Sequence, residues 1–164
     1  MKLIAQVKLL ITPGQSDALK CTIETANAAC DYLSEQAWDA KTFGQYSLHK
    51  LAYHETRRQF PTLSSQVIVR CIARVADAYK LDRRARRTFK PYGAIAYDDR
   101  ILRWYVDRSE ISIWTMNGRE RIQFVCGERQ RALLQFRQGE SNLIFHRGEF
   151  YLAATCNVEE PPTQ

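Results

Sequence analysis

Alternating apolar and polar residues at the start of the chain predict a β-strand over residues 2–11. Side chains in a strand point alternately to opposite faces, so one face of this segment is expected to be buried. Ile4 and Leu10 break the alternation, and the sequence "TPGQ" then ends the strand. The expected buried positions are Leu3, Ala5, Val7 and Leu9.

Three amphipathic helices are predicted to follow, over residues 15–38, 47–60 and 64–80. Apolar residues recur every three or four positions in each segment, which places them on one helical face. Ser47 is the predicted N-cap of the second helix, because a serine hydroxyl there accepts a hydrogen bond from a free backbone N–H. The predicted inward residues are Leu19, Ile23, Ala26, Cys30, Leu33 and Ala37 in the first helix, Leu48, Leu51 and Ala52 in the second, and Val67, Ile68, Cys71, Ile72, Val75 and Tyr79 in the third.

After Lys80 the apolar period changes to two, which indicates strands. Asn117–Gly118 and Arg147–Gly148 predict tight hairpin turns, and residues 128–136 predict a short helix. The first strand needs partners, and they can come only from these late segments. We therefore predict an α+β fold, an antiparallel oligonucleotide-binding-like β-barrel with a three-helix bundle inserted after its first strand. The expected late strands lie at residues 94–97, 101–106, 109–116, 119–125, 142–146 and 149–156.

Composition indicates an ordinary globular protein of 164 residues. No apolar run approaches the roughly 18 residues of a membrane span, and the first residues lack the apolar stretch of a signal peptide. We expect a cytoplasmic, nucleoid-associated protein with no membrane partner. The cysteines form no C-x-x-C pair and are expected to be buried free thiols, namely Cys21, Cys30, Cys71, Cys126 and Cys156. A zinc site built from them with His49, His54 or His146 is the alternative, but the spacing does not indicate one.

The net charge of +6 is concentrated in one short segment. Residues 1–79 carry nine basic and seven acidic groups, and residues 94–164 carry nine and ten. Residues 80–93 carry six basic groups and one acid, Asp82, which gives +5. A focused positive charge of this kind favours an acidic partner, most often nucleic acid.

The basic residues are too dense to share one helical face, so the segment suits a strand or loop that lies along a phosphate backbone. Arginine forks match phosphate oxygens bidentately, and such contacts give affinity without sequence information. A solvated linker between helix and sheet is the alternative interpretation. The candidate phosphate contacts are Lys80, Arg83, Arg84, Arg86, Arg87 and Lys90.

The third predicted helix offers a second candidate surface, opposite its apolar face. Gln66, Arg70, Arg74 and Asp77 follow helical steps, and polar residues including Ser64 and Ser65 precede or open the helix. Helix-turn-helix proteins reach base edges with this layout, although a routine capped surface helix has it too. Aromatic residues in connecting segments are further candidates, since they can stack on bases. These are Phe43, Tyr46, Phe89 and Tyr92.

Motifs of catalysis are missing from the sequence: it contains no glycine-rich phosphate loop, no G-x-S-x-G and no H-E-x-x-H. Asp98–Asp99 reads as a turn between two strands rather than as a metal site. We therefore propose no catalytic residue.

Several stretches, taken in order, resemble the N-terminal portion of the TnpB (OrfB) family. These are transposon-encoded RNA-guided DNA nucleases related to type V CRISPR effectors. The resemblance runs over the whole chain. It rests on "KLIAQVKLLITPGQSDALKCTIETANAACDYLSEQAW", "TFGQYSLHKL", "LSSQVIVRCIARVADAYK", "RTFKPYGAIAYDDRIL" and "FYLAATCNVEEP".

The resemblance implies a wedge-like barrel domain of residues 1–12 and 84–158, a helical recognition domain of residues 13–83, and a linker at 159–164. It further implies guide RNA and double-stranded target DNA as partners. A short transposon-adjacent DNA motif would be read near Phe43, Gln45 and Tyr46 and near Ser64, Ser65, Gln66 and Arg70. Magnesium and zinc, and the nuclease activity, are expected only in the family's C-terminal nuclease domain, which would be a further partner. This chain is expected to hold no cofactor.

Two other functions stay open at the level of sequence. A stand-alone helix-turn-helix-like repressor would bind a specific duplex tightly without RNA. A protein-interaction module would dock the basic segment on an acidic protein surface, and nucleic acid would not compete with that partner.

Overall fold

The computed structural model describes residues 1–159 of the chain. Its elements are β1 (Lys2–Leu10), α1 (Pro13–Ala40), α2 (Gln45–Gln59), α3 (Ser65–Leu81), β2 (Ile95–Tyr97), β3 (Leu102–Tyr105), η1 (Val106–Arg108), β4 (Glu110–Thr115), β5 (Gly118–Val125), α4 (Glu128–Leu134), β6 (Arg137–His146) and β7 (Glu149–Asn157). The predicted α+β class is confirmed. So is the change from helices to strands after Lys80.

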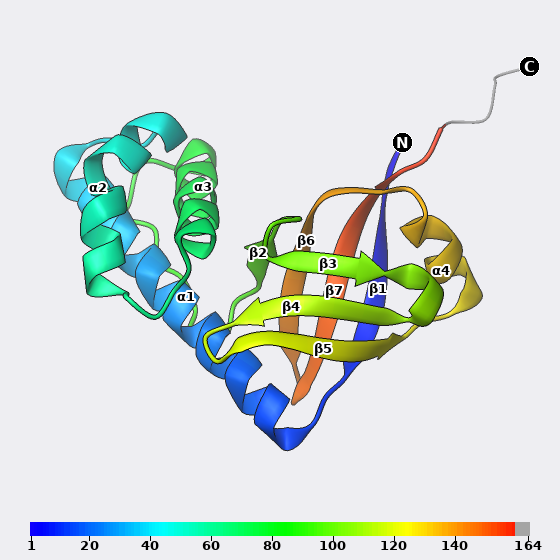
Figure 1. Cartoon of the computed structure of the whole chain (residues 1–164). Helices are drawn as coiled ribbons and strands as arrows, with labels where there is room; N and C mark the ends of the chain where they lie inside the picture. Colours follow the sequence, from blue (N-terminus) through cyan, green and yellow to red (C-terminus); the bar gives the residue numbers. More distant parts are fainter. Residues whose placement is uncertain (160–164) are drawn as a thin grey trace, which may run out of the picture.

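The strands form one antiparallel sheet in the order β2-β6-β7-β1-β5-β4-β3, which curves into a nearly closed barrel (Figure 1). β1 lies in the middle of this order, paired with β7 on one side and β5 on the other. The predicted alternation is present in β1, where Ala5, Val7 and Leu9 are buried, whereas Ile4 is 58% exposed. The first strand thus finds its partners among the late strands, as the sequence predicted.

Both predicted hairpins are present. Thr115 pairs with Gly118 across the first, and the two turn residues are Met116 and Asn117. Arg147 and Gly148 form the second turn with φ angles of 51° and 80°. Two successive positive φ values match the type I′ turn that follows the right-handed twist of paired strands.

Helices α2 and α3 lie together at one side of the molecule, and α1 runs from them to the barrel (Figure 1). All predicted inward residues of α1 and α3 are buried. Two predictions for α2 are wrong. Its N-cap is Gly44 rather than Ser47, and Leu51 is 48% exposed because it lies off the face that carries Leu48 and Ala52.

The helices contact the barrel through α1 and α3. The buried hydroxyl of Thr22 accepts a hydrogen bond from the backbone N–H of Met116 at 3.0 Å, beside the β4–β5 turn. The division into a barrel of residues 1–12 and 84–158 and a helical unit of residues 13–83 stays a prediction. Beyond Glu159, the predicted terminal linker lies outside the described residues.

Candidate nucleic-acid interface

The basic segment, residues 80–90, begins on the last turn of α3 and continues as irregular chain along α1. Two polar side chains of α1 form hydrogen bonds with the backbone of this segment. The carboxylate of Asp31 accepts a hydrogen bond from the backbone N–H of Phe89 at 2.7 Å. The hydroxyl of Ser34, which is fully buried, donates to the carbonyl of Arg87. The backbone of the segment is therefore fixed against a helix.

A third α1 side chain extends this attachment past the basic segment. Asn27 is buried, and its amide nitrogen donates to the carbonyls of Pro91 at 3.1 Å and Gly93 at 2.9 Å. Its amide oxygen accepts from Arg74 at 2.6 Å. A Cβ atom at Gly93 would lie 3.1 Å from a terminal nitrogen of Arg74, so this close approach suits glycine. Buried polar groups paired in this way favour one loop conformation over others.

Tyr79 connects α3 to the same segment. Its ring is buried, and its hydroxyl accepts the backbone N–H of Arg87 at 3.1 Å while lying 2.8 Å from the Ser34 hydroxyl. Phe43 packs on the Tyr79 ring at 4.7 Å, and the Arg83 guanidinium covers Phe43 at 5.5 Å. Phe43 therefore packs within the helical group, which leaves little of its ring for stacking on a base.

With the backbone fixed, two arginine side chains of the segment extend toward solvent. The side chain of Arg84 is 92% exposed, and that of Arg86 is 45% exposed. Arg84 lies 3.1 Å from Asp82, whereas Arg86 lies 3.6 Å from Glu35 of α1. Exposed pairs of this kind contribute only about 0–1 kcal/mol, so a phosphate can replace the carboxylates.

The Asp82 carboxylate pairs with both Arg84 and Arg87. The backbone N–H and then the side chain of Arg84 lower the pKa of Asp82, and Arg87, 3.7 Å away, adds to this effect. Asp77 lies 3.7 Å from Lys80. With Glu35 and Asp31 also beside the segment, its local positive excess is smaller than the linear count of +5 indicated.

The expectation that Gln66, Arg70 and Arg74 form an exposed face of α3 is wrong. All three are half-buried, because this side of α3 packs toward the barrel. The Arg70 guanidinium bonds Glu140 and lies 3.5 Å from the Asp98 carboxylate, with 19% of its side chain exposed. Sequence periodicity identifies the side of α3 opposite its apolar stripe, but it does not predict that the barrel partly covers that side.

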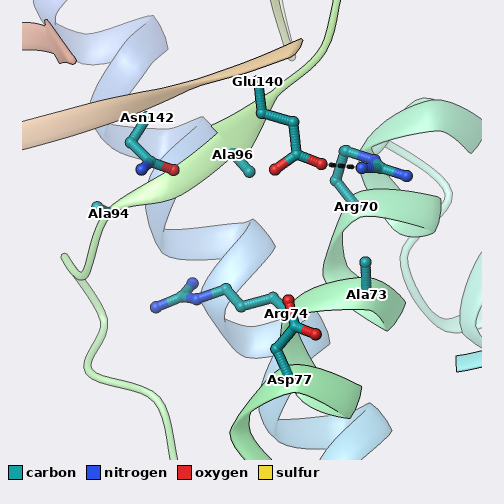
Figure 2. Close-up of a pocket in the computed structure, with 8 residues that line it drawn as sticks. All are labelled: Arg70, Ala73, Arg74, Asp77, Ala94, Ala96, Glu140 and Asn142. Carbon is teal, nitrogen blue, oxygen red and sulfur yellow. Dashed lines mark hydrogen bonds and ion pairs between the residues drawn. The ribbon is translucent and has the colours of Figure 1, made fainter. Parts of the chain in front are cut away.

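A hollow of about 380 Å³ lies beside these arginines, between α3, β2 and β6 (Figure 2). The Arg70 side chain turns to Glu140, while the Arg74 side chain extends along the hollow toward the chain near Ala94 (Figure 2). Arg74 stacks on Phe89 at 4.9 Å. Both arginines thus connect α3 to its neighbours in addition to lining the hollow.

The remaining predicted motif-reading residues lie at the starts of α2 and α3. The Ser64 hydroxyl caps α3 by accepting the N–H of Val67 at 3.2 Å, while Ser65 is exposed. Gln45 is exposed and Tyr46 is 80% exposed. Of the aromatic candidates, Tyr46 offers the freest ring.

Sequence reasoning missed two groups of residues. The first group attaches the basic segment to α1, and only the buried polar positions on an otherwise apolar face hinted at it. The second is a set of exposed arginines on β3, η1 and β5. The first group consists of Asn27, Asp31 and Ser34. The second consists of Arg103, Arg108, Arg119 and Arg121.

Within residues 1–159, no three His, Cys, Asp or Glu side chains gather as a metal site would require. None of the helices in this range combines the length and the apolarity needed to cross a membrane. No protein-family profile matches the chain, and no curated protein matches it.

Proposed function

We propose that this chain is a nucleic-acid-binding module whose basic segment, residues 80–90, lies against a phosphate backbone. One observation carries the proposal. Arg84 and Arg86 project from a loop whose backbone is attached to α1 by Ser34 and Asp31, so the backbone that carries these cations is placed before a ligand arrives. Preorganisation of this kind lowers the entropic cost of binding.

We further propose that the module holds a guide RNA and helps to read a short DNA motif, as in TnpB-like nucleases. The resemblance in sequence supports this, together with an element order in which three helices follow the first strand of an oligonucleotide-binding-like barrel. Motif reading is assigned to the exposed residues Gln45, Tyr46 and Ser65. Gln66, Arg70 and Arg74 would instead hold the helices against the barrel. DNA cleavage would require a separate nuclease domain.

The repressor alternative loses its main support. A helix-turn-helix protein inserts its second helix into the major groove, and that use needs an exposed polar face. The corresponding face of α3 carries Arg70 and Arg74, which are engaged by Glu140 and Asn27.

The test is a salt titration of binding to a labelled structured RNA, to a DNA duplex and to both together. Binding through phosphate contacts must weaken steeply as salt rises. The guide-dependent proposal predicts that selection from a randomised duplex library enriches a short motif only when RNA is present. Enrichment without RNA would favour the repressor, and no binding at low salt would reject nucleic-acid binding altogether.

A further inference from the structure

We propose that the outer face of β3, β4 and β5 is a second binding surface, which takes a single strand of RNA or DNA. Its residues, called the barrel-face cluster, are Arg103, Tyr105, Arg108, Arg119 and Arg121. None of them belongs to the basic segment. The inference rests on the proposed function, because it too requires a nucleic-acid partner.

Strand register brings the cluster together. Arg103 of β3 lies opposite Ser112 of β4, and Ser112 lies opposite Arg121 of β5. Arg119 follows on β5, opposite Trp114. The intervening residues of these strands point into the core, so the arginines all face outward. The inward residues are Leu102, Ile111, Ile113 and Ile122.

Tyr105 orders two of these arginines. The guanidinium carbons of Arg121 and Arg108 lie 4.5 Å and 4.8 Å from the centre of its ring. Arg121 is also held by Glu110 at 2.7 Å. A guanidinium over an aromatic ring keeps its charge and its outward N–H groups, and it presents a flat surface on which a base can stack. The cluster is therefore preorganised for stacking as well as for phosphate contacts.

Two shallow hollows run across the same strands. One, of about 390 Å³, is lined by residues of β3 together with Arg137 of β6 and Asp99 of the β2–β3 turn; the β3 residues are Leu102, Arg103, Trp104 and Tyr105. The other, of about 260 Å³, is lined by Arg103, Tyr105, Ser112 and Arg119. The two hollows adjoin each other at Arg103 and Tyr105. Hollows beside the strands of an oligonucleotide-binding-like barrel suit an unpaired strand, since its bases are free to stack.

The charge of the face favours the same partner. Within residues 1–159, no carboxylate pairs with Arg103, Arg108 or Arg119. Arg119 does bind the carbonyl of Arg100 and the Ser112 side chain, which fixes its position. The strand β3 is also the last in the sheet order, so its outer edge carries backbone groups that can meet a ligand.

The test measures fluorescence anisotropy of a labelled 12-nucleotide RNA, the same sequence as DNA, and its duplex, over a salt series. The variant Arg103→Ala with Arg119→Ala should bind both single strands at least tenfold more weakly. Its slope of log K against log salt should be shallower by about 1.4, at roughly 0.7 per lost phosphate contact. The RNA and DNA arms show whether the 2′-hydroxyl contributes.

The matched control is Arg129→Ala with Arg147→Ala, which removes two exposed arginines outside both clusters. Equal loss in the control, or single-strand binding as strong as in the unaltered protein, would overturn the inference. Displacement by polyglutamate at equal charge concentration would also overturn it, in favour of an acidic protein surface. If the unaltered protein binds no probe at low salt, the proposed function fails as well. If the unaltered protein binds RNA or DNA and the Arg103–Arg119 variant binds single strands equally well, the barrel-face inference is wrong while the proposed function stands.

Loss of Arg119 removes hydrogen bonds across the strands, so a second measurement guards against misfolding. Ultraviolet crosslinking of the unaltered protein to the RNA, followed by peptide mapping, should place adducts on Tyr105. Adducts confined to α2 and α3 would contradict the proposal without any variant.

Discussion

The carboxylate of Asp31 on α1 accepts the backbone N–H of Phe89 at 2.7 Å, and this bond ties the basic segment to the helix beneath it. Replacing Asp31 by alanine should leave that N–H without its partner. We expect a loss of about 1–3 kcal/mol in the free energy of unfolding, the usual cost of an unmet hydrogen bond to a charged group. Faster amide exchange at residues 87–93 should accompany it.

Asp39→Ala is the matched control, because Asp39 is an exposed carboxylate near the end of the same helix. Denaturant unfolding and hydrogen exchange would be measured on both variants. If the two variants behave alike, the segment is held by other contacts and Asp31 is not its anchor.

Arg74 should matter for stability more than a surface arginine does. It bonds Asn27 at 2.6 Å and stacks on Phe89 at 4.9 Å, so Arg74→Ala removes a hydrogen bond and a cation–π contact together. A loss of about 2–4 kcal/mol is expected from these two contributions. Arg74→Lys should recover part of it, since lysine keeps the charge but not the planar fork. If Arg74→Ala is as stable as the unaltered protein, the contacts of Arg74 with Asn27 and Phe89 contribute little to the free energy of unfolding.

The arginine contacts lower the pKa of Asp82, and the sign of the pH effect follows from that shift. A depressed carboxyl pKa stabilises the fold at pH values above the unfolded pKa, which is about 3.9. This contribution is lost as the pH falls through the folded pKa. Carbon-detected NMR titration should find the pKa of Asp82 below the usual aspartate range. Arg84→Ala should raise this pKa in part, because the backbone N–H at that position remains. An unchanged titration in Arg84→Ala would contradict the assignment.

Thiol reactivity should separate the five cysteines into two classes. The expectation that all five are buried is wrong for Cys21, which is exposed, and for Cys126, which is half-buried; Cys30, Cys71 and Cys156 are buried. A hydrogen bond with Cys30 and burial raise the pKa of the Cys71 thiol, which keeps it protonated and unreactive. In the folded protein a disulfide reagent should modify Cys21 first and Cys126 next. The buried three should react only on unfolding. Simultaneous reaction of all five would show that the helical core opens readily.

The sequence predicted the fold well where burial has a simple period. The apolar stripe of α1 from Leu19 to Ala37 and the alternation in β1 predicted most of their buried residues correctly, because the spacing of apolar residues indicates which face packs against another layer. The turn at Arg147–Gly148 was predicted at its position, whereas the first hairpin turns at Met116–Asn117, one residue before the predicted Asn117–Gly118. In contrast, Leu51 was misplaced because α2 buries only a narrow stripe of residues spaced by four, and Leu51 lies beside that stripe. The stripe is Leu48, Ala52 and Thr56.

Prediction of the site was less complete, for a physical reason. Arg70 and Arg74 look like solvent-facing residues in one dimension, but Glu140 and Asn27, 70 and 47 residues away in sequence, engage them in the structure. The barrel-face cluster was missed for the opposite reason. Its arginines are spread over β3, η1 and β5, and only strand pairing brings them together.

The proposed function depends on contact between a phosphate backbone and the side chains of Arg84 and Arg86. The most direct test is to measure RNA binding over a salt series for a variant that lacks both side chains. They are the best targets in the basic segment, because Arg83 also packs on Phe43 and the backbone of Arg87 is attached to Ser34 and Tyr79. Arg84→Ala with Arg86→Ala would be compared with Arg129→Ala with Arg147→Ala on the same labelled RNA.

We expect only a small loss of thermal stability in the Arg84–Arg86 variant, because the ion pairs that it removes are exposed. Its slope of log K against log salt should be shallower by about 1.4, while the control variant keeps the slope of the unaltered protein. Equal slopes for the unaltered protein and the Arg84–Arg86 variant would contradict it.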